Sequence, residues 1–314
     1  MRAVFFFILI IAALDIAAIA QAPAEAIKVE PANGFSYPYY LYIPAEMRAP
    51  SEKGGKFTLL VMPNNSGKTD DDLGVQEADV KRRIAQAQTA FAKLGVAILM
   101  PVFPRPRSDW KIYTHALDRD SMLTDKAEYR RFDLQLIAMI DHARKRFEKN
   151  GVKVDGRVLI YGFSAAGMFS DRFAFLHPDR VKAAAVGAPG GWPIAPVADF
   201  KDKALRYPLG VADIKAVSGK KVDLKELRKV SFLVFMGDKD DNDSLPFADG
   251  YEPEDKELAF SLFGPTPISR WETSKQLYKE SGLDAEFKLY PETPHKVTMA
   301  MIEDITAFFA KHIK

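Results

Sequence analysis

The stretch that decides the fold is RVLIYGFSAAGMFSDRFAF, residues 157–175. An apolar segment, 158–161, predicts a strand that ends at Gly162, and a helical pattern begins at Ala165. Small residues on both sides of Ser164 allow a sharp turn there, which would raise the serine hydroxyl above the edge of a sheet. The helix N-terminus beside it favours developing negative charge. A serine that only caps the helix is the simpler alternative.

The rest of the chain alternates between apolar segments and helical patterns. Further strands are predicted at 39–43, 57–62, 96–101, 181–186, 230–236 and 286–290. A periodicity of about 3.6 residues predicts helices over 80–94, 131–147, 165–176 and 297–312. Several strands are apolar throughout, as expected when helices cover both faces of a sheet. The sequence therefore predicts an α/β fold with one doubly wound, mostly parallel sheet.

Two long connections interrupt this alternation. Residues 189–227 contain GGWPIAP and RYPLG, and residues 241–273 are rich in acids, aromatics and prolines. Connections of this length within a compact domain are usually functional, so we expect two lid-like insertions. The remaining pattern is continuous, which predicts a single domain over residues 27–314.

The N-terminus predicts export. Arg2, the apolar residues 3–14 and an A-x-A site ending at Ala20 form a signal peptide pattern over residues 1–20. Asp15 interrupts the apolar run before it reaches membrane-spanning length, so no stable membrane anchor is expected. We therefore expect a periplasmic or secreted protein.

The composition excludes several classes of function. The 314 residues contain no cysteine, which removes disulfides, a thiol nucleophile, cysteine-based metal sites and a cysteine-linked lipid anchor. The 44 basic and 42 acidic residues nearly balance and form no basic cluster, so no nucleic-acid partner is expected.

A serine hydroxyl becomes a strong nucleophile only when an imidazole accepts its proton and a carboxylate orients that imidazole. In a strand–turn–helix unit of this kind, the acid and base follow the serine in loops after later strands. Asp240 follows one such strand in GDKDDND, and His295 follows the next in TPHKVT. Asp238 and Asp243 are alternatives for the acid, and a solvated acidic loop or calcium site is the simpler interpretation of the cluster. Only His295, among five histidines, stands at the position expected for the base.

The loop VMPNNSGKTDD, residues 61–71, ends like a phosphate-binding P-loop in SGKT. The first glycine of that motif would fall on Met62, and three aspartates follow, so nucleotide binding is disfavoured. A loop after an early strand can instead supply one of two backbone amides that stabilise an oxyanion. We predict the amides of Asn65 and Ala165, with Ser66 as the alternative to Asn65. The Asn65 side chain closing a local turn is the simpler interpretation.

Candidate substrate-pocket residues are His115, Phe163 and Trp192. His115 follows the strand predicted at 96–101, at the same edge of the sheet as the serine, and Trp192 begins the first insertion. Packing of the aromatic side chains in the core or beneath a lid is the alternative.

Taken together, residues 35–312 resemble the α/β-hydrolase superfamily, and within it secreted bacterial esterases of the polyhydroxybutyrate-depolymerase and feruloyl-esterase type. The segments that carry the resemblance are PNNSG (63–67), GFSAAGMF (162–169), HPDRVKAAAVGAPGGWP (177–193), GDKDDND (237–243) and TPHKVT (293–298). Two departures are Ala166 in place of the second glycine of G-x-S-x-G and the absence of a His-Gly pair in the oxyanion loop.

The resemblance implies a serine hydrolase that cleaves small or polymeric carboxylic esters without a metal or organic cofactor. A peptidase of the prolyl-oligopeptidase type and a non-catalytic binding protein on the same scaffold are the alternatives. The sequence leaves the oligomeric state open.

Overall fold

The computed structural model describes residues 25–50 and 55–313. The predicted signal peptide, residues 1–20, lies outside the described residues. The main sheet has eight strands, in the spatial order β1 (Ile27–Val29), β2 (Tyr39–Tyr42), β4 (Ala97–Pro101), β3 (Leu59–Val61), β5 (Val158–Phe163), β6 (Val181–Gly187), β9 (Ser231–Gly237) and β10 (Asp284–Tyr290). From β4 to β10 every neighbouring pair is parallel, whereas β2 is antiparallel to both of its neighbours.

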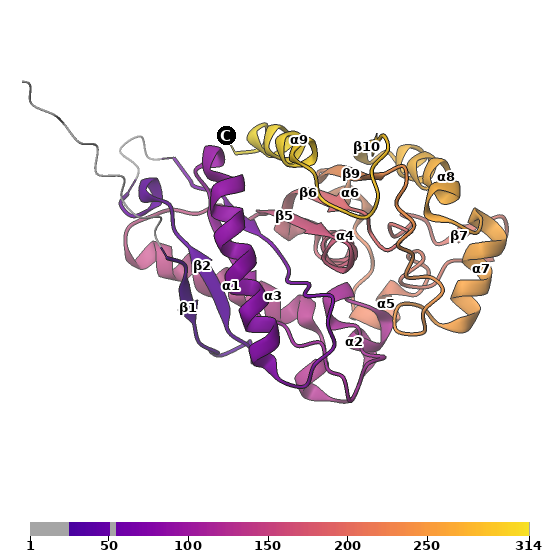
Figure 1. Cartoon of the computed structure of the whole chain (residues 1–314), viewed down its shortest axis with the longest axis horizontal. Coiled ribbons are helices and arrows are strands. Elements are labelled where there is room, and N and C mark those ends of the chain that lie inside the picture. Colours follow the sequence, from indigo (N-terminus) through magenta and orange to yellow (C-terminus); the bar gives the residue numbers. More distant parts are fainter. Residues whose placement is uncertain (1–24, 51–54, 314) are drawn as a thin grey trace, which may run out of the picture.

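Helices cover both faces of this sheet (Figure 1). On one face, α1 (Leu73–Ala90) and α9 (Met299–Ala310) pack on strand side chains such as Leu60 and Leu159. The opposite face carries α3 (Phe132–Lys149), α4 (Ala165–Leu176) and α8 (Pro267–Glu280). Each strand therefore contributes to two hydrophobic cores, which explains why the central strands are apolar along their whole length.

The predicted strands and helices are confirmed, with shifts at their ends. The largest shift is in α1, which begins at Leu73 because the Asp72 carboxylate accepts a hydrogen bond from the Gly74 amide and caps the helix. The buried position in the first turns of α1 is held by Gln76 rather than by an apolar side chain, so hydrophobic periodicity did not reveal them. Strand β1 was not predicted because its three residues include the charged Lys28 and form no apolar run.

The two long connections contain short elements of their own. The first includes β7 (Asp199–Phe200), β8 (Lys203–Ala204), α5 (Ile214–Ser218) and α6 (Leu224–Leu227), and the second contains α7 (Pro253–Phe263) and the start of α8. The remaining short elements are α2 (Arg119–Leu123) and the 3-10 turns η1 (Ala45–Met47), η2 (Ala92–Leu94), η3 (Thr114–Ala116), η4 (Ala127–Tyr129) and η5 (Pro178–Arg180).

The two connections pack against each other. Trp192 from the first stacks on Phe263 from the second, with ring centroids 4.1 Å apart. Both belong to a third apolar cluster that also contains Ala165 and Met168 at the start of α4. The connections therefore lie over the turn that carries Ser164. Within the described residues, no helix combines the length and the apolar character needed to cross a membrane.

The turn between β5 and α4 depends on two close backbone approaches. A Cβ atom on Gly162 would lie 1.9 Å from the Ala166 carbonyl oxygen, and one on Gly167 would lie 2.3 Å from the Gly187 carbonyl oxygen on β6. No side chain fits at either position. The G-x-S-x-G pattern would place its second glycine at Ala166, whereas in this chain the approach to β6 occurs one residue later.

We expect Gly167→Ala to lower the free energy of unfolding by about 1–3 kcal/mol, because the added methyl group would force α4 away from β6. Urea denaturation of the purified protein measures this difference. Gly156→Ala is the matched control, since its Cβ would meet no atom within 4 Å, and a change within about 0.5 kcal/mol is expected. Equal losses in the two variants would contradict the packing argument.

Candidate active site

Ser164 occupies a strained position between β5 and α4. Its backbone angles are φ 61° and ψ −128°, a conformation that L-residues rarely adopt. The surrounding structure maintains this conformation, since the Ser164 amide donates to the Gly187 carbonyl at 2.9 Å and the Ser164 carbonyl accepts from the Met168 amide at 3.0 Å. Strain of this kind costs about 1–3 kcal/mol and is concentrated at functional sites.

Asp240 and His295 form a direct pair at the same edge of the sheet. The two Asp240 carboxylate oxygens lie 3.0 and 2.9 Å from Nδ1 of His295. A carboxylate only accepts hydrogen bonds, so Nδ1 carries the proton and Nε2 of the neutral ring is left as an acceptor. Asp240 is only 5% exposed, and this burial protects the pair from competition with water.

The loops after β9 and β10 bring these two residues together. The Lys239 amide donates to the Thr293 carbonyl at 3.1 Å, and a Cβ atom on Gly237 would lie 1.8 Å from the same carbonyl oxygen. The Asp240 amide donates to the Gly237 carbonyl at 3.2 Å. The glycine at the end of β9 therefore permits the two loops to touch, and their contact sets the distance between the acid and the imidazole.

Phe163 connects the imidazole with the serine turn. Its ring packs against the His295 ring, with centroids 4.8 Å apart, and it directly precedes Ser164. The serine, acid and histidine thus follow the carboxyl ends of the parallel strands β5, β9 and β10, which all meet at one edge of the sheet.

The other aspartates of the acidic loop have different surroundings. Asp243 forms an ion pair with the buried guanidinium of Arg270, and burial raises the pKa of this carboxyl. The Asp238 amide donates to the Tyr290 carbonyl at 3.0 Å, and one oxygen of its carboxyl is buried without a hydrogen-bond partner among the described residues. The structure pairs Asp240 with His295, and it gives neither alternative aspartate that contact.

The loop after β3 lies beside Ser164. Asn65 and Ser164 line the same cavity, of about 310 Å³. The Asn65 side-chain oxygen accepts a hydrogen bond from the Gly67 amide at 3.2 Å, which is the local turn considered as the simpler interpretation of this side chain. The backbone amide of Asn65 takes no part in this turn. That this amide donates a hydrogen bond to an oxyanion stays a prediction.

Asn64 anchors this loop, a role that was not predicted from the sequence. Its side-chain oxygen accepts from the Phe103 amide, and its side-chain nitrogen donates to the Phe103 carbonyl, both at 3.0 Å. Asn64 is buried and so fastens the loop after β3 to the segment after β4. An asparagine directly after a buried strand was the available signal, but only the fold shows which backbone groups it meets.

Two of the predicted pocket residues are buried away from this cavity, and the prediction for them is corrected. Trp192 is 1% exposed, and its indole nitrogen donates to the Leu209 carbonyl at 2.9 Å. His115 is fully buried and donates from Nε2 to the Phe103 carbonyl at 2.8 Å. Trp192 is covered because the two long connections pack against each other. Burial lowers the pKa of His115 to about 4, so the His115 ring is neutral at pH 7.

The cavity beside Ser164 is mainly polar. Arg105 donates to the Asp249 carboxylate at 3.1 Å and lies over the Tyr113 ring, 3.8 Å from its centroid. These three residues line the cavity together with Asn65, Asn242 and Asp243, and Phe247 stands 62% exposed at its margin. No sequence pattern indicates Arg105 or Asp249, because they are far apart in the chain and only the fold pairs them.

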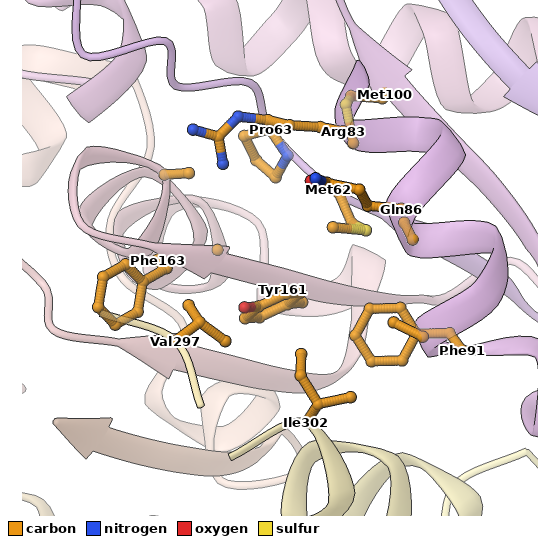
Figure 2. A pocket seen from close by; sticks show the side chains of 14 residues that line it. Met62, Pro63, Arg83, Gln86, Phe91, Met100, Tyr161, Phe163, Val297 and Ile302 are labelled. Atoms are coloured by element: carbon orange, nitrogen blue, oxygen red, sulfur yellow. The ribbon is translucent and has the colours of Figure 1, made fainter. Parts of the chain in front are cut away.

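The third predicted pocket residue, Phe163, lines a different and largely apolar cavity of about 220 Å³. This cavity lies on the α1 and α9 side of the sheet. Figure 2 shows Tyr161 near its centre, with Phe163 and Val297 on one side and Phe91 on the other. Among the described residues, no group of three or more acidic, histidine or cysteine side chains is arranged to bind a metal ion.

No family model matches the sequence, and no curated protein is a recognisable relative by sequence. Several solved structures are similar to the fold. Poly(aspartic acid) hydrolase-1 from Sphingomonas sp. KT-1 has a TM-score of 0.55 and 19% identity over 92% of this chain and 97% of that one. The poly(3-hydroxybutyrate) depolymerase LpqC from Bordetella parapertussis has a TM-score of 0.54 and 17% identity over 92% and 91% of the two chains.

A third similar structure is carboxyl esterase 2 from Tuber melanosporum, with a TM-score of 0.52 and 14% identity over 94% of this chain and 90% of that one. At such identities the likeness concerns the fold. The chain has the α/β-hydrolase fold, which confirms the predicted fold class and the predicted resemblance to this superfamily.

His115 predicts a specific pH dependence of stability. The unfolded chain binds a proton at this histidine as the pH falls through 6.5, whereas the folded protein does so only near pH 4. Its contribution to stability is therefore lost as the pH falls between these values, by up to about 1.4 kcal/mol per pH unit. We expect His115→Gln to unfold with a shallower pH dependence in this window, measured by urea denaturation at pH 7 and pH 4.5. Parallel curves for the two proteins would contradict the buried, neutral state.

Proposed function

We propose that this protein is an exported serine hydrolase that cleaves carboxylic esters through an acyl-enzyme intermediate. The observation that carries the proposal is the Asp240–His295 pair, located at the same sheet edge as the strained Ser164. The fold supports it, because the three similar structures described above are a hydrolase, a depolymerase and an esterase. Export rests on the signal peptide pattern of residues 1–20.

In the proposed reaction, the Ser164 hydroxyl attacks the ester carbonyl while Nε2 of His295 accepts its proton. Asp240 keeps Nδ1 protonated and stabilises the imidazolium that forms. His295 then donates the proton to the departing alcohol, which leaves the acyl group on Ser164. A water molecule, deprotonated by His295, attacks the acyl-enzyme and releases the acid. Side chains and backbone amides of this chain supply each of these roles.

The negative charge of the tetrahedral intermediate requires donors that are in place before the reaction. The Ala165 amide is the first of α4, so it is suited to this role, and the helix dipole adds to its effect. The Asn65 amide is the proposed second donor, because the loop that carries it is fastened by Asn64 beside Ser164. Each such donor is worth about 3–4 kcal/mol of transition-state stabilisation.

Ser164→Ala should abolish nitrophenyl-ester hydrolysis and prevent covalent labelling by a fluorophosphonate probe, since no other nucleophile would take the place of the serine hydroxyl. Mass spectrometry of the labelled protein identifies the modified residue. Ser244→Ala is the matched control, because Ser244 lines the same cavity, and it should label as the wild type does. Labelling of the Ser164→Ala protein would refute the nucleophile assignment.

Asp240→Asn should lower kcat by about 10⁴-fold, because an amide no longer stabilises the imidazolium and permits the wrong tautomer. Steady-state kinetics on a nitrophenyl ester give this value. The exposed neighbour Asp241 offers a control, and Asp241→Asn should leave kcat within a factor of about two, as expected for a surface change. A larger loss in Asp243→Asn than in Asp240→Asn would transfer the acid role to Asp243.

A further inference from the structure

The apolar cavity beside the serine turn continues into a groove between two helices. Gln86 and Ala90 of α1 and Ile302 of α9 line both the cavity and this groove, which has a volume of about 1040 Å³. The groove exists because its helices carry alanines there, including Ala85 and Ala307, whose short side chains leave the space between the helices unfilled.

The cavity, at which the groove begins, borders the serine turn. Gly162, Phe163 and Ala166 line the cavity, and these residues flank Ser164 in the chain. The methyl group of Ala166 is therefore part of the cavity wall at the position where the G-x-S-x-G pattern would have glycine. Val297, two residues after His295, forms another part of the wall, close to Phe163 in Figure 2.

Apolar side chains are exposed where the cavity and groove meet solvent. Met299, which lines the groove, is 72% exposed, and Val297 is 40% exposed. Charged side chains among the lining residues are few. Arg83 lines the cavity and is paired with Asp79 of the same helix, and Lys93 and Glu303 line the groove. This arrangement suits an uncharged chain of methylene groups.

The position of His295 indicates which half of an ester would enter. The imidazole must donate its proton to the alcohol oxygen that leaves, so the alcohol half lies beside His295. Phe163 packs on the His295 ring and lines the apolar cavity, whereas Asn65 lines the polar cavity together with Ser164. The two halves of the substrate would therefore meet opposite surroundings, the alcohol apolar and the acyl group polar.

We propose that the cavity and groove between α1 and α9 bind the apolar alcohol chain of the ester, and that the polar cavity with Arg105 and Asp249 accepts the acyl group. This inference rests on the proposed function. The chain would select esters by the length of the alcohol, and the acyl group would be short or polar.

The test compares two series of esters: acetates of methanol to octanol, and methyl esters of acetic to octanoic acid. Proton release in a pH-stat follows their hydrolysis. We expect kcat/KM to rise with alcohol length by up to about fourfold per methylene, the factor equivalent to about 0.8 kcal/mol of buried methylene. No such rise is expected in the acyl series. A rise with acyl length alone, or with neither length, would overturn the assignment.

Ala90→Trp and Ala307→Trp should remove the dependence of kcat/KM on alcohol length, because the indole fills the space that the longer alcohols would occupy. Ala307 is exposed, so its variant is expected to fold even if the half-buried Ala90 does not tolerate tryptophan. The matched controls are Ala78→Trp on α1 and Ala300→Trp on α9, both exposed and outside the groove lining. Equal length dependence in groove and control variants would overturn the proposal. The proposal would also be overturned if the groove variants changed only the molecular mass measured by size-exclusion chromatography. That result would indicate that the groove forms a contact between copies of this chain.

Binding separates this inference from the proposed function. Isothermal titration of 1-octanol into the Ser164→Ala protein needs no turnover, and it should show saturable binding that Ala307→Trp weakens at least tenfold and Ala300→Trp does not. If no ester is hydrolysed but this pattern is found, the groove binds an apolar alcohol and the proposed reaction fails. If esters are hydrolysed and Ala307→Trp binds 1-octanol as Ala300→Trp does, the groove assignment fails alone.

Discussion

The rest of the site depends on one close backbone contact, between the start of α4 and the end of β6. The Gly187 carbonyl lies where the Cβ of any other residue at position 167 would be, and the same carbonyl accepts the hydrogen bond of the Ser164 amide. One oxygen atom therefore positions both the helix and the strained serine. Strain at a single residue can persist only where several such contacts determine the backbone together.

The parallel order of the strands then determines where the acid and base can stand. Because β5, β9 and β10 run in the same direction, their carboxyl ends meet at one edge, and residues distant in the chain become neighbours. The contact between the Lys239 amide and the Thr293 carbonyl sets the separation of the last two loops. The hydrogen-bonded Asp240–His295 pair is a consequence of that contact.

The two cavities beside the serine turn differ in character because different elements bound them. The polar one is bounded by the loops after β3, β4 and β9, where buried charges are paired, as in Arg105 with Asp249. The apolar one is bounded by α1, α9 and the end of β5. A substrate bound at Ser164 would contact both the polar and the apolar cavity. The difference in polarity between the two cavities is the basis of the proposed selection by alcohol length.

The sequence by itself determined the fold class, the central strands and the helices α1, α3, α4 and α9, because apolar runs and 3.6-residue periodicity follow directly from burial on two faces of a sheet. It also indicated Ser164, Asp240 and His295, because each follows a strand in a recognisable turn. The elements it missed, such as β1, α8 and the first turns of α1, are those whose apolar pattern is too short or too weak to detect.

Only the tertiary structure decided which side chains share a cavity. Trp192 and His115 have the chemistry of pocket residues, yet packing of the two connections and of the segment after β4 buries them. Arg105 and Asp249, in contrast, become partners across the fold. The periodicity of a sequence indicates whether a side chain is buried against its own sheet. Contacts between distant loops depend instead on the complete arrangement of the chain, and these contacts define the surroundings of Ser164.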